Sequence, residues 1–277
     1  MAEAKSKKIS AQERARQAAL EEAKKIKAQR EAKERRMKMI GLVAVVAVAI
    51  IVAVIVVLVL QTTNGPGFDE IEAKPTGAQE SGALLIGQDL VVGGQPARGD
   101  DVVVLRVYSD YICPGCGSVE GRLGQRMEDM AAAGQIQLEI APLVTLDGQS
   151  TTRYSSRATD AAMVVANYSP DKFLAFHKLL FANQPPEGSA GLSDDELKDL
   201  ARQVEVPETT IERFGNDEFA EWIAYANSQA QKQPVQTTPS LWMGKSDSDL
   251  TLVKNPGSIN LDRARQRVLA GQDLNQE

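Results

Sequence analysis

The sequence predicts an α/β domain with an inserted helical subdomain, preceded by a single transmembrane helix and a basic helical tail. Three observations support this prediction. An uncharged run of 21 residues, 40–60, follows a tail rich in Lys and Arg. Beyond it, β-branched runs precede a long stretch with helical periodicity. Cys113 and Cys116, the only cysteines among 277 residues, directly follow the most pronounced β-branched run.

Residues 1–39 are the basic tail. They contain 13 Lys or Arg and six acidic residues, whereas the rest of the chain contains 18 and 31. Ala, Glu, Lys, Arg and Gln dominate the tail and favour a helix, but the large apolar residues are too irregularly spaced for a coiled coil. We expect a solvated cytoplasmic helix, with binding to anionic lipid headgroups as the alternative. Charge alone does not indicate nucleic-acid binding.

The uncharged run 40–60 is long enough to cross a bilayer, at about 30 Å as a helix. A cleaved signal peptide fits less well, because the charged region is too long, the run exceeds about 15 residues and no Ala-x-Ala site follows. Lys74 is the only Lys or Arg in the twenty residues after the run. The positive-inside rule therefore places the carboxy-terminal body outside the cytoplasm, where disulfides form. We expect a single-pass protein of the cell membrane.

Residues 61–82 are expected to be a linker, because Gly65-Pro66-Gly67 and the turn at 74–77 interrupt regular structure. The remaining residues, 83–277, are enough for one domain with a substantial core.

The first part of this domain predicts a parallel strand pair. Residues 101–108 form a β-branched run typical of a central strand, and residues 83–92 contain an edge strand. A helix over 117–133 continues from the cysteines. Residues 137–144 alternate as a second core strand, which a βαβ crossover would place parallel to the first.

The second part begins with a helical insertion over about 153–231, in which Ser193 and Glu196 form a capping box. Strand patterns return at 240–243 and 250–253, and 258–269 predicts a closing helix. This order of elements predicts a thioredoxin-like fold with an inserted helical subdomain.

The cysteine pair indicates redox chemistry. A disulfide in Cys113-Pro114-Gly115-Cys116 would close a four-residue loop and stabilise the fold by only about 2 kcal/mol. We expect Cys113 at the helix N-cap with Pro114 at the first helical position, so that free N–H groups and the helix dipole lower the pKa of Cys113. Cys116, one turn further on, would then resolve mixed disulfides.

Other uses of the pair are less consistent with the sequence. A structural zinc site needs about four ligands, whereas the chain has two cysteines and one histidine. A two-thiolate Cu(I) site and an inert pair of reduced thiols are the remaining alternatives. Because sulfur atoms carry the electrons in thiol–disulfide exchange, we expect no metal and no bound cofactor.

Three segments resemble the DsbA-like family of membrane-anchored or secreted thiol–disulfide oxidoreductases. They are Asp110-Tyr111-Ile112-Cys113-Pro114-Gly115-Cys116, residues 173–184 (FLAFHKLLFANQ) and Thr237-Thr238-Pro239-Ser240. They occur in the family's order, and the resemblance extends over about 84–270.

The resemblance implies a catalytic disulfide that passes between exported proteins bearing thiols and a membrane quinone-linked reoxidase. It also implies a cis Thr238-Pro239 peptide bond beside the catalytic Cys113 and Cys116. Thr238 and Pro239 would then bind substrate, with the Thr238 backbone pairing with a bound peptide as an added strand.

The sequence departs from the family in two places. Gly115 replaces the histidine of the best-known oxidases and has no side chain to stabilise the Cys113 thiolate. Val107 occupies a position where many relatives have a buried acid, so proton transfer to Cys116 would use water, Asp110 or another acid. The only histidine, His177, lies among Phe173, Phe176 and Phe181, which indicates a role in helix packing.

The sequence therefore predicts an extracytoplasmic thiol–disulfide oxidoreductase, and an oxidase before a reductase. Cys113 and Cys116 are the expected catalytic residues, with Pro114, Gly115 and Asp110 supporting them. The alternatives are a reductase or isomerase, for example in cytochrome maturation, and a non-enzymatic, membrane-tethered metal-binding module.

Overall fold

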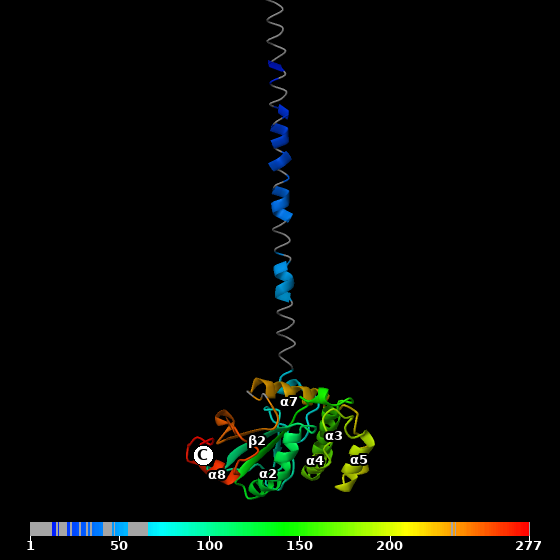
Figure 1. Cartoon of the computed structure of the whole chain (residues 1–277), viewed down its shortest axis with the longest axis vertical. Helices are drawn as coiled ribbons and strands as arrows, with labels where there is room; N and C mark the ends of the chain where they lie inside the picture. The colour runs from blue at the N-terminus through cyan, green and yellow to red at the C-terminus, as the bar shows by residue number, and fades with distance from the viewer. Residues whose placement is uncertain are drawn as a thin grey trace, which may run out of the picture. The chain divides into compact units, whose positions relative to one another are not determined.

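The computed structural model describes residues 13–14, 16, 21–22, 24–27, 29–31, 33, 35–40, 46, 48–54, 66–233, 235 and 237–276. It divides the chain into two units, Met1–Gly65 and Pro66–Glu277 (Figure 1).

In the first unit, the described residues are helical and exposed. The predicted span 40–60 is described only at 40, 46 and 48–54, and the rest of the span lies outside the described residues. In the part of the chain that is described, no helix has both the length and the hydropathy to cross a membrane. Six large apolar residues are described from Val46 to Val54, and each is between 49% and 60% exposed.

The second unit contains a mixed sheet with the strand order β1-β3-β2-β4-β5. Its strands are β1 Leu84–Ile86, β2 Val103–Ser109, β3 Ile136–Pro142, β4 Ser240–Gly244 and β5 Thr251–Leu252. Strands β2 and β3 are parallel, and each other neighbouring pair is antiparallel. The expected parallel pair and the central position of β2 are confirmed.

Helix α2, Pro114–Ala132, connects the parallel strands β2 and β3. Its buried side chains include Val119, Leu123, Met127 and Met130, which recur at helical spacing and pack into the main core. Burial of this stripe against β3 holds the first turn of α2 directly beyond the end of β2.

The helical insertion follows β3. It consists of η2 Asp147–Gln149, α3 Tyr154–Tyr168, α4 Phe173–Ala182, α5 Asp194–Gln203, α6 Glu208–Ile211 and α7 Ala220–Lys232. Helix α4 packs on α2, α3 and α5, and Figure 1 shows α3, α4 and α5 side by side at one end of the domain. The Ser193–Glu196 capping box at the start of α5 is confirmed.

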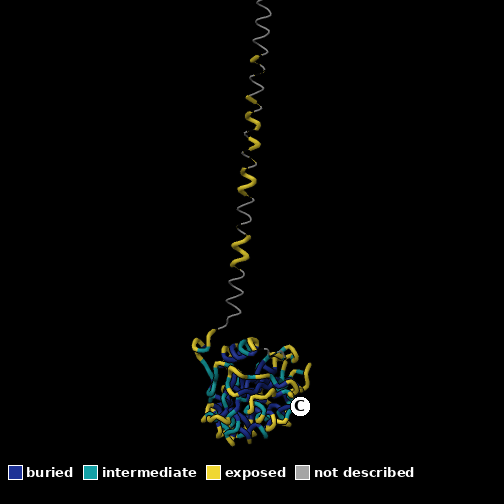
Figure 2. Tube along the Cα trace, turned by 90° about the vertical axis from the view of Figure 1, so that its left-hand side faces the viewer, coloured by how far each residue is buried: buried dark blue, intermediate teal, exposed yellow. Residues whose placement is uncertain are grey.

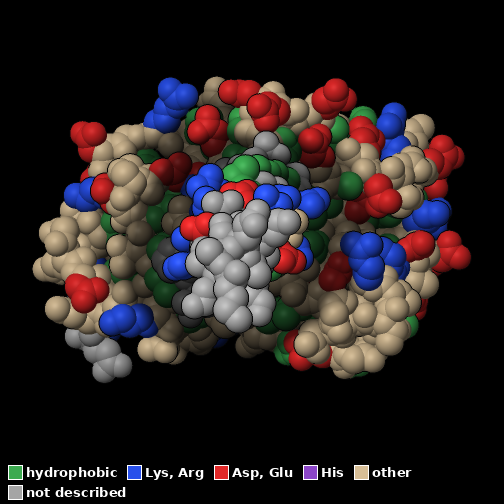
Figure 3. All heavy atoms as spheres, turned by 90° about the horizontal axis from the view of Figure 1, so that it is seen from above, with side chains coloured by type: hydrophobic (Ala, Val, Ile, Leu, Met, Phe, Trp, Pro, Cys, Tyr) green, Lys and Arg blue, Asp and Glu red, His purple; other side chains and the backbone are tan. Residues whose placement is uncertain are grey.

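The last elements are η3 Asp247–Asp249 and α8 Leu261–Leu269. Helix α8 begins three residues after the predicted start, because the Asn260 side chain accepts from the N–H of Arg263 and caps the helix there. Buried residues fill the interior between the sheet and the helices (Figure 2), and Figure 3 shows acidic side chains spread over one face of this unit.

Residues 66–82, expected to belong to the linker, are part of the second unit and pack against the rest of it. They contain η1 Phe68–Glu70 and the buried Ile71. The Phe68 ring lies 6.1 Å from the Trp222 ring. The N–H of Thr76 donates to Asn167 Oδ1 at 3.1 Å, so the predicted turn at 74–77 is fixed to α3. Aromatic and polar contacts to distant helices thus extend the unit towards the amino terminus. The local pattern of prolines and glycines does not predict these contacts.

Candidate redox-active site

The two cysteines lie where β2 gives way to α2. Cys113 is the N-cap residue of α2, with φ −74° and ψ 114°, and Pro114 is the first helical residue. The N–H groups of Cys116 and Gly117 donate to the Cys113 carbonyl at 3.0 and 3.2 Å. Both cysteines are reduced in this structure. The predicted N-cap arrangement is confirmed, and it leaves the first N–H groups of α2 near the Cys113 sulfur.

Cys113 carries the more acidic thiol. A hydrogen bond from the Cys116 thiol, helped by the N–H groups of Cys116 and Gly115, lowers the pKa of Cys113 from 9.0 to about 6 against the effect of burial. The Cys113 Sγ atom also lies 3.3 Å from the carbonyl oxygen of Thr238, to which the protonated thiol donates. At neutral pH Cys113 is therefore largely a thiolate.

Cys116 has the opposite character. Only 2% of this residue is exposed, and burial, followed by its interaction with Cys113, raises the pKa of Cys116 above its ordinary value. Its Sγ atom accepts a hydrogen bond from the N–H of Asp110 at 3.5 Å. Cys116 is thus a protonated, shielded thiol that donates to its more acidic neighbour.

Thr238 and Pro239 lie beside the cysteines, as expected, and the peptide bond between them is cis. A side chain at Gly115 would begin 3.8 Å from Cys113 Sγ and 3.0 Å from Pro239 Cδ. Gly115 therefore faces Pro239 at close range and leaves the sulfur without a neighbouring side chain from the dipeptide. Residues 237–239 lead into β4, which is antiparallel to β2, and this pairing brings the two distant segments together.

Asp110 is buried beneath the motif, with 1% of the residue exposed. Its carboxylate accepts from the N–H groups of Ile112 and Leu146 at 3.1 and 2.9 Å, and from the Ser155 hydroxyl at 2.6 Å. Burial raises the pKa of Asp110, although these three donors act in the opposite direction. The carboxylate fixes the loop between β2 and α2 to the start of α3. Val107 is buried on β2, so that position supplies no acid.

His177 on α4 packs in the core, as the sequence predicts. Its ring stacks on Phe173 at 5.6 Å and meets Phe181 edge-on at 5.0 Å. Its Nδ1 atom lies 2.8 Å from the Tyr111 hydroxyl, and its Nε2 atom lies 3.7 Å from Glu120. The expected neighbour Phe176 instead packs against the Phe214 ring.

Glu120 is an acid beside His177 that the sequence analysis does not single out. It lies on α2, one turn after Cys116. Burial acts to raise its pKa, but the hydrogen bond and charge of His177 lower the pKa of Glu120 overall. The spacing of four residues from Cys116 along a helix is the signal that marks Glu120.

Gln184, after α4, is a second residue that the sequence analysis does not single out. Its Nε2 atom donates to the carbonyls of Tyr111 and Cys113 at 3.0 and 2.9 Å. It lies at the end of the family-like segment 173–184, which is the only signal for it in the sequence. Through these two bonds the helical insertion holds the backbone on which the reactive sulfur is mounted.

The structure therefore brings Cys113, Cys116, Pro114, Gly115 and the Thr238-Pro239 pair into one site, with Asp110 below it. Within the described residues, no three His, Cys, Asp or Glu side chains are arranged to hold a metal ion. An acidic thiol at the helix N-cap next to a more deeply buried, protonated thiol is an arrangement suited to thiol–disulfide exchange.

Comparison with known proteins agrees with this chemistry. A family model described as thioredoxin matches residues 87–252. Disulfide bond formation protein D of Bacillus subtilis is 28% identical over 167 residues, which span 57% of this chain and 73% of that protein.

Two solved structures are similar in fold. Oxidised BdbD from Bacillus subtilis superposes with a TM-score of 0.56 at 22% identity, covering 73% of this chain and all of BdbD. The reduced disulfide bond oxidoreductase DsbG from Mycobacterium tuberculosis superposes with a TM-score of 0.52 at 26% identity, covering 64% of this chain and 82% of DsbG. The predicted thioredoxin-like fold with helical insertions is confirmed.

Proposed function

The chain belongs to the thioredoxin family, and from this premise we propose that it is a membrane-anchored oxidase that introduces disulfides into exported proteins. It is a protein thiol–disulfide oxidoreductase, as its similar proteins are. The observation that carries the proposal is the contrast between the two thiols, because the pKa of Cys113 is lowered to about 6 while that of Cys116 is raised.

The reaction is a pair of exchanges at sulfur. In the oxidised protein, a substrate thiolate attacks Cys113 Sγ, the Cys113–Cys116 bond breaks, and Cys116 leaves and takes up a proton. A second thiolate of the substrate then attacks the substrate sulfur of the mixed disulfide and expels Cys113 as a thiolate. The substrate gains a disulfide and loses two electrons, and the protein retains both electrons as two reduced cysteines.

The acidity of Cys113 favours the oxidising direction. At pH 7, lowering a thiol pKa from 9.0 to about 6 stabilises the reduced form by about 1.4 kcal/mol, because ionisation is then nearly complete. For a two-electron couple this corresponds to about 30 mV towards a more oxidising disulfide. The shift is moderate, which is consistent with a dipeptide whose Gly115 adds no side chain near the sulfur.

Substrate binding is assigned to the edge beside the cysteines. The Thr238 carbonyl lies next to Cys113 Sγ, so an extended substrate that pairs with the Thr238 backbone would have its own sulfur close to Cys113. A membrane quinone-linked reoxidase would then remove the electrons from reduced Cys113 and Cys116.

The membrane anchor is assigned to 40–60, with the basic tail in the cytoplasm. Apolar side chains described at 46, 48 and 50–54 are exposed rather than packed in a core, which is the arrangement expected of a lipid-facing helix. The anchor would hold the catalytic domain next to the membrane that contains its reoxidase.

Labelling of an engineered cysteine at Ser6 and one at Ser258 with a membrane-impermeant maleimide, in a Cys113→Ser, Cys116→Ser background, tests this topology. Modification of Ser258→Cys but not Ser6→Cys in intact cells is expected, and the reverse pattern would refute it.

The direction of the reaction is tested by measuring the reduction potential against glutathione. We expect a value well above that of thioredoxin, about −270 mV, and below that of the strong oxidant DsbA, about −120 mV. A value at or below that of thioredoxin, together with efficient reduction of insulin, would establish the reductase alternative instead. Stoichiometric copper binding without either activity would establish the metal-binding module.

Substrates are tested with Cys116→Ser in cells. Without the resolving thiol, mixed disulfides on Cys113 persist and can be isolated. The matched control is Cys113→Ser, which retains Cys116 but lacks the acidic nucleophile. Recovery of exported proteins with Cys116→Ser but not with the control is expected, and recovery of none would refute a general role with protein thiols.

A further inference from the structure

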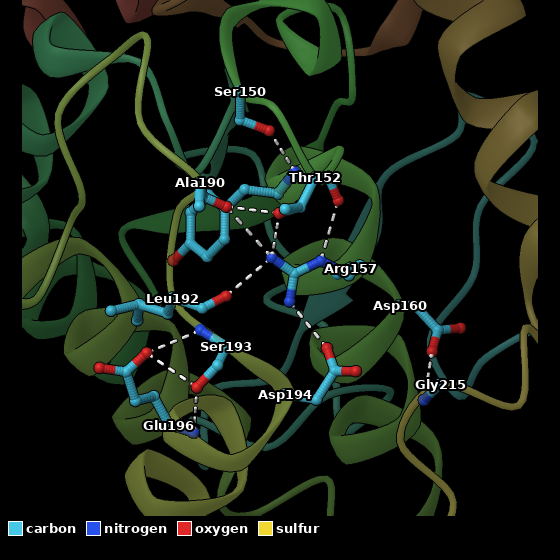
Figure 4. Close-up of polar contacts among 11 residues, drawn as sticks. Ser150, Thr152, Arg157, Asp160, Ala190, Leu192, Ser193, Asp194, Glu196 and Gly215 are labelled. Carbon is cyan, nitrogen blue, oxygen red and sulfur yellow. Dashed lines mark hydrogen bonds and ion pairs between the residues drawn. The ribbon is translucent and has the colours of Figure 1, made fainter.

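A cavity in the helical insertion lies apart from the cysteines. It has a volume of about 310 Å³, within the range of small-ligand sites, and lies between the start of α3, the start of α5 and residues 214–217 (Figure 4). Its polar lining includes Arg153, Arg157, Asp160, Asp194 and Asp217, and its apolar lining comes from Ala161, Leu197 and Phe214.

Asp160 is the unusual residue of this cavity. Only 4% of it is exposed, and its Oδ1 atom is buried without a hydrogen-bond donor. Its Oδ2 atom accepts one bond from the N–H of Gly215 at 3.2 Å (Figure 4). Among the described residues, no Lys, Arg or His pairs with Asp160. A buried carboxylate without a cation is costly, so a positively charged group placed beside Asp160 would stabilise it.

The arginines of the cavity do not supply that charge. Arg157 donates to the Thr152 backbone and hydroxyl, to the Leu192 carbonyl and to Asp194, and Figure 4 shows no bond between Arg157 and Asp160. Arg153 donates to Asp147 and to the Ser156 hydroxyl. Because both guanidinium groups are already bound to acceptors of the protein, the cavity has little to offer an anion.

The wall of the cavity formed by residues 214–217 carries negative charge. Asp217 lines the cavity, and Asp217 and Glu218 both act on Asp160 as like charges, which, after burial, help to raise the pKa of Asp160 to about 6. A divalent metal ion is disfavoured, because within the described residues no three potential ligands are gathered at one point. The apolar residues Leu197 and Phe214 instead suit the carbon chain of an organic cation.

We propose that this cavity binds a primary ammonium group on an apolar stem, with Asp160 as its counter-ion. The ammonium group would donate to the Asp160 carboxylate, and the stem would contact Ala161, Leu197 and Phe214. A lysine side chain of a bound polypeptide and a free polyamine share this chemistry. The proposal does not depend on the redox function, since none of these residues contacts Cys113 or Cys116.

Calorimetric titration of the full chain in non-ionic detergent with pentylamine tests the proposal. Pentanol is the matched probe, because it has the same stem without a charge. We expect pentylamine to bind about 10- to 150-fold more tightly than pentanol, as a hydrogen bond to a charged partner requires. This comparison uses the unchanged protein, so it does not depend on the folding of a variant. Equal affinity for the two probes, or binding of neither, would overturn the proposal.

The variant Asp160→Asn keeps the shape of the side chain and removes its charge. We expect it to lose the preference for pentylamine, whereas Asp171→Asn, which removes an exposed acid after α3, should retain it. Retention of the preference in Asp160→Asn would assign the ammonium to another site. Titration with spermidine and with Nα-acetyl-lysine methylamide then identifies the source, because tighter binding of spermidine indicates a polyamine and tighter binding of the lysine derivative indicates a polypeptide.

Discussion

The low pKa of Cys113 depends mainly on the neighbouring thiol of Cys116. The hydrogen bond from Cys116 is the largest cause of the low pKa of Cys113. Replacing Cys116 with Ala removes this donor, whereas replacing it with Ser retains a hydroxyl at the same place. Because the chain has no other cysteine, each variant leaves Cys113 as the only thiol to be measured.

The expected alkylation rates of Cys113 follow from its pKa of about 6. At pH 7 about 90% of Cys113 is thiolate, against about 1% for a thiol of pKa 9.0, but a more acidic thiolate is a weaker nucleophile, with a Brønsted slope of about 0.45. Alkylation of Cys113 should then be about fourfold faster than that of an ordinary thiol at pH 7, and about 40-fold faster at pH 5. Loss of a hydrogen bond to a charged group, about 1.5–3 kcal/mol, should raise the pKa in Cys116→Ala by about one to two units.

The assay is alkylation by iodoacetamide over a pH series, followed by mass spectrometry of the intact chain. We expect a midpoint near pH 6 for Cys116→Ser, a midpoint one to two units higher for Cys116→Ala, and the ordinary value for either variant in denaturant. Equal midpoints for the Ala and Ser variants would show that the Cys116 hydrogen bond does not control the acidity. A midpoint near 9 in the folded Ser variant would refute an activated Cys113 altogether.

Three further predictions concern buried polar groups. Ser155→Ala removes a donor from Asp110 and should lower the free energy of unfolding, measured with urea, by about 1.5–3 kcal/mol. Tyr111→Phe leaves His177 Nδ1 without its partner and should lower it by about 1–3 kcal/mol. Asp160→Asn should instead raise it by up to about 3 kcal/mol above pH 6, because burial raises the pKa of Asp160 from 3.8 to about 6 and ionisation in the folded state is unfavourable. This gain should vanish below about pH 4, where the carboxyl is protonated in both states.

Matched controls separate these effects from general ones. Ser258→Ala changes an exposed position and should leave the free energy of unfolding within about 0.5 kcal/mol of its original value. Asp171→Asn should show no gain at any pH. A stabilisation by Asp160→Asn that persists below pH 4 would contradict the assigned pKa, and unchanged stability of Ser155→Ala or Tyr111→Phe would show that water replaces the lost partner.

The local pattern of the sequence predicts most of the fold that surrounds the cysteines. The apolar residues of the β-branched run that becomes β2 and of the alternating run that becomes β3 are buried in the core, as their patterns predict. The patterns do not predict that Arg106 and Glu139 on the same strands are buried as well. Cys113 as N-cap and Pro114 as first helical residue follow from the chemistry of helix termini. The position of Thr238 and Pro239 beside the cysteines follows only from the resemblance to a family, because no local pattern joins residues so far apart in the sequence.

The parts that sequence reasoning does not reach are held by contacts between distant segments. Gln184 donates to the Cys113 carbonyl across 71 positions, and Ser155 donates to Asp110 across 45. A polar side chain on a helix has the same local pattern whether it faces solvent or a buried carbonyl. The sequence places Ile71 in a linker for a similar reason, since isolated apolar residues among prolines and glycines show no periodicity, although Ile71 is buried.

Burial of Cys116 also governs how long the covalent intermediate with a substrate survives. Once Cys113 is joined to a client protein, Cys116 can reverse the reaction only as a thiolate, and its raised pKa makes that form scarce. In the proposed oxidase, the second thiol of the substrate would then have longer to attack the mixed disulfide. The raised pKa of Cys116 would thereby favour completion of the substrate disulfide over reversal of the first exchange.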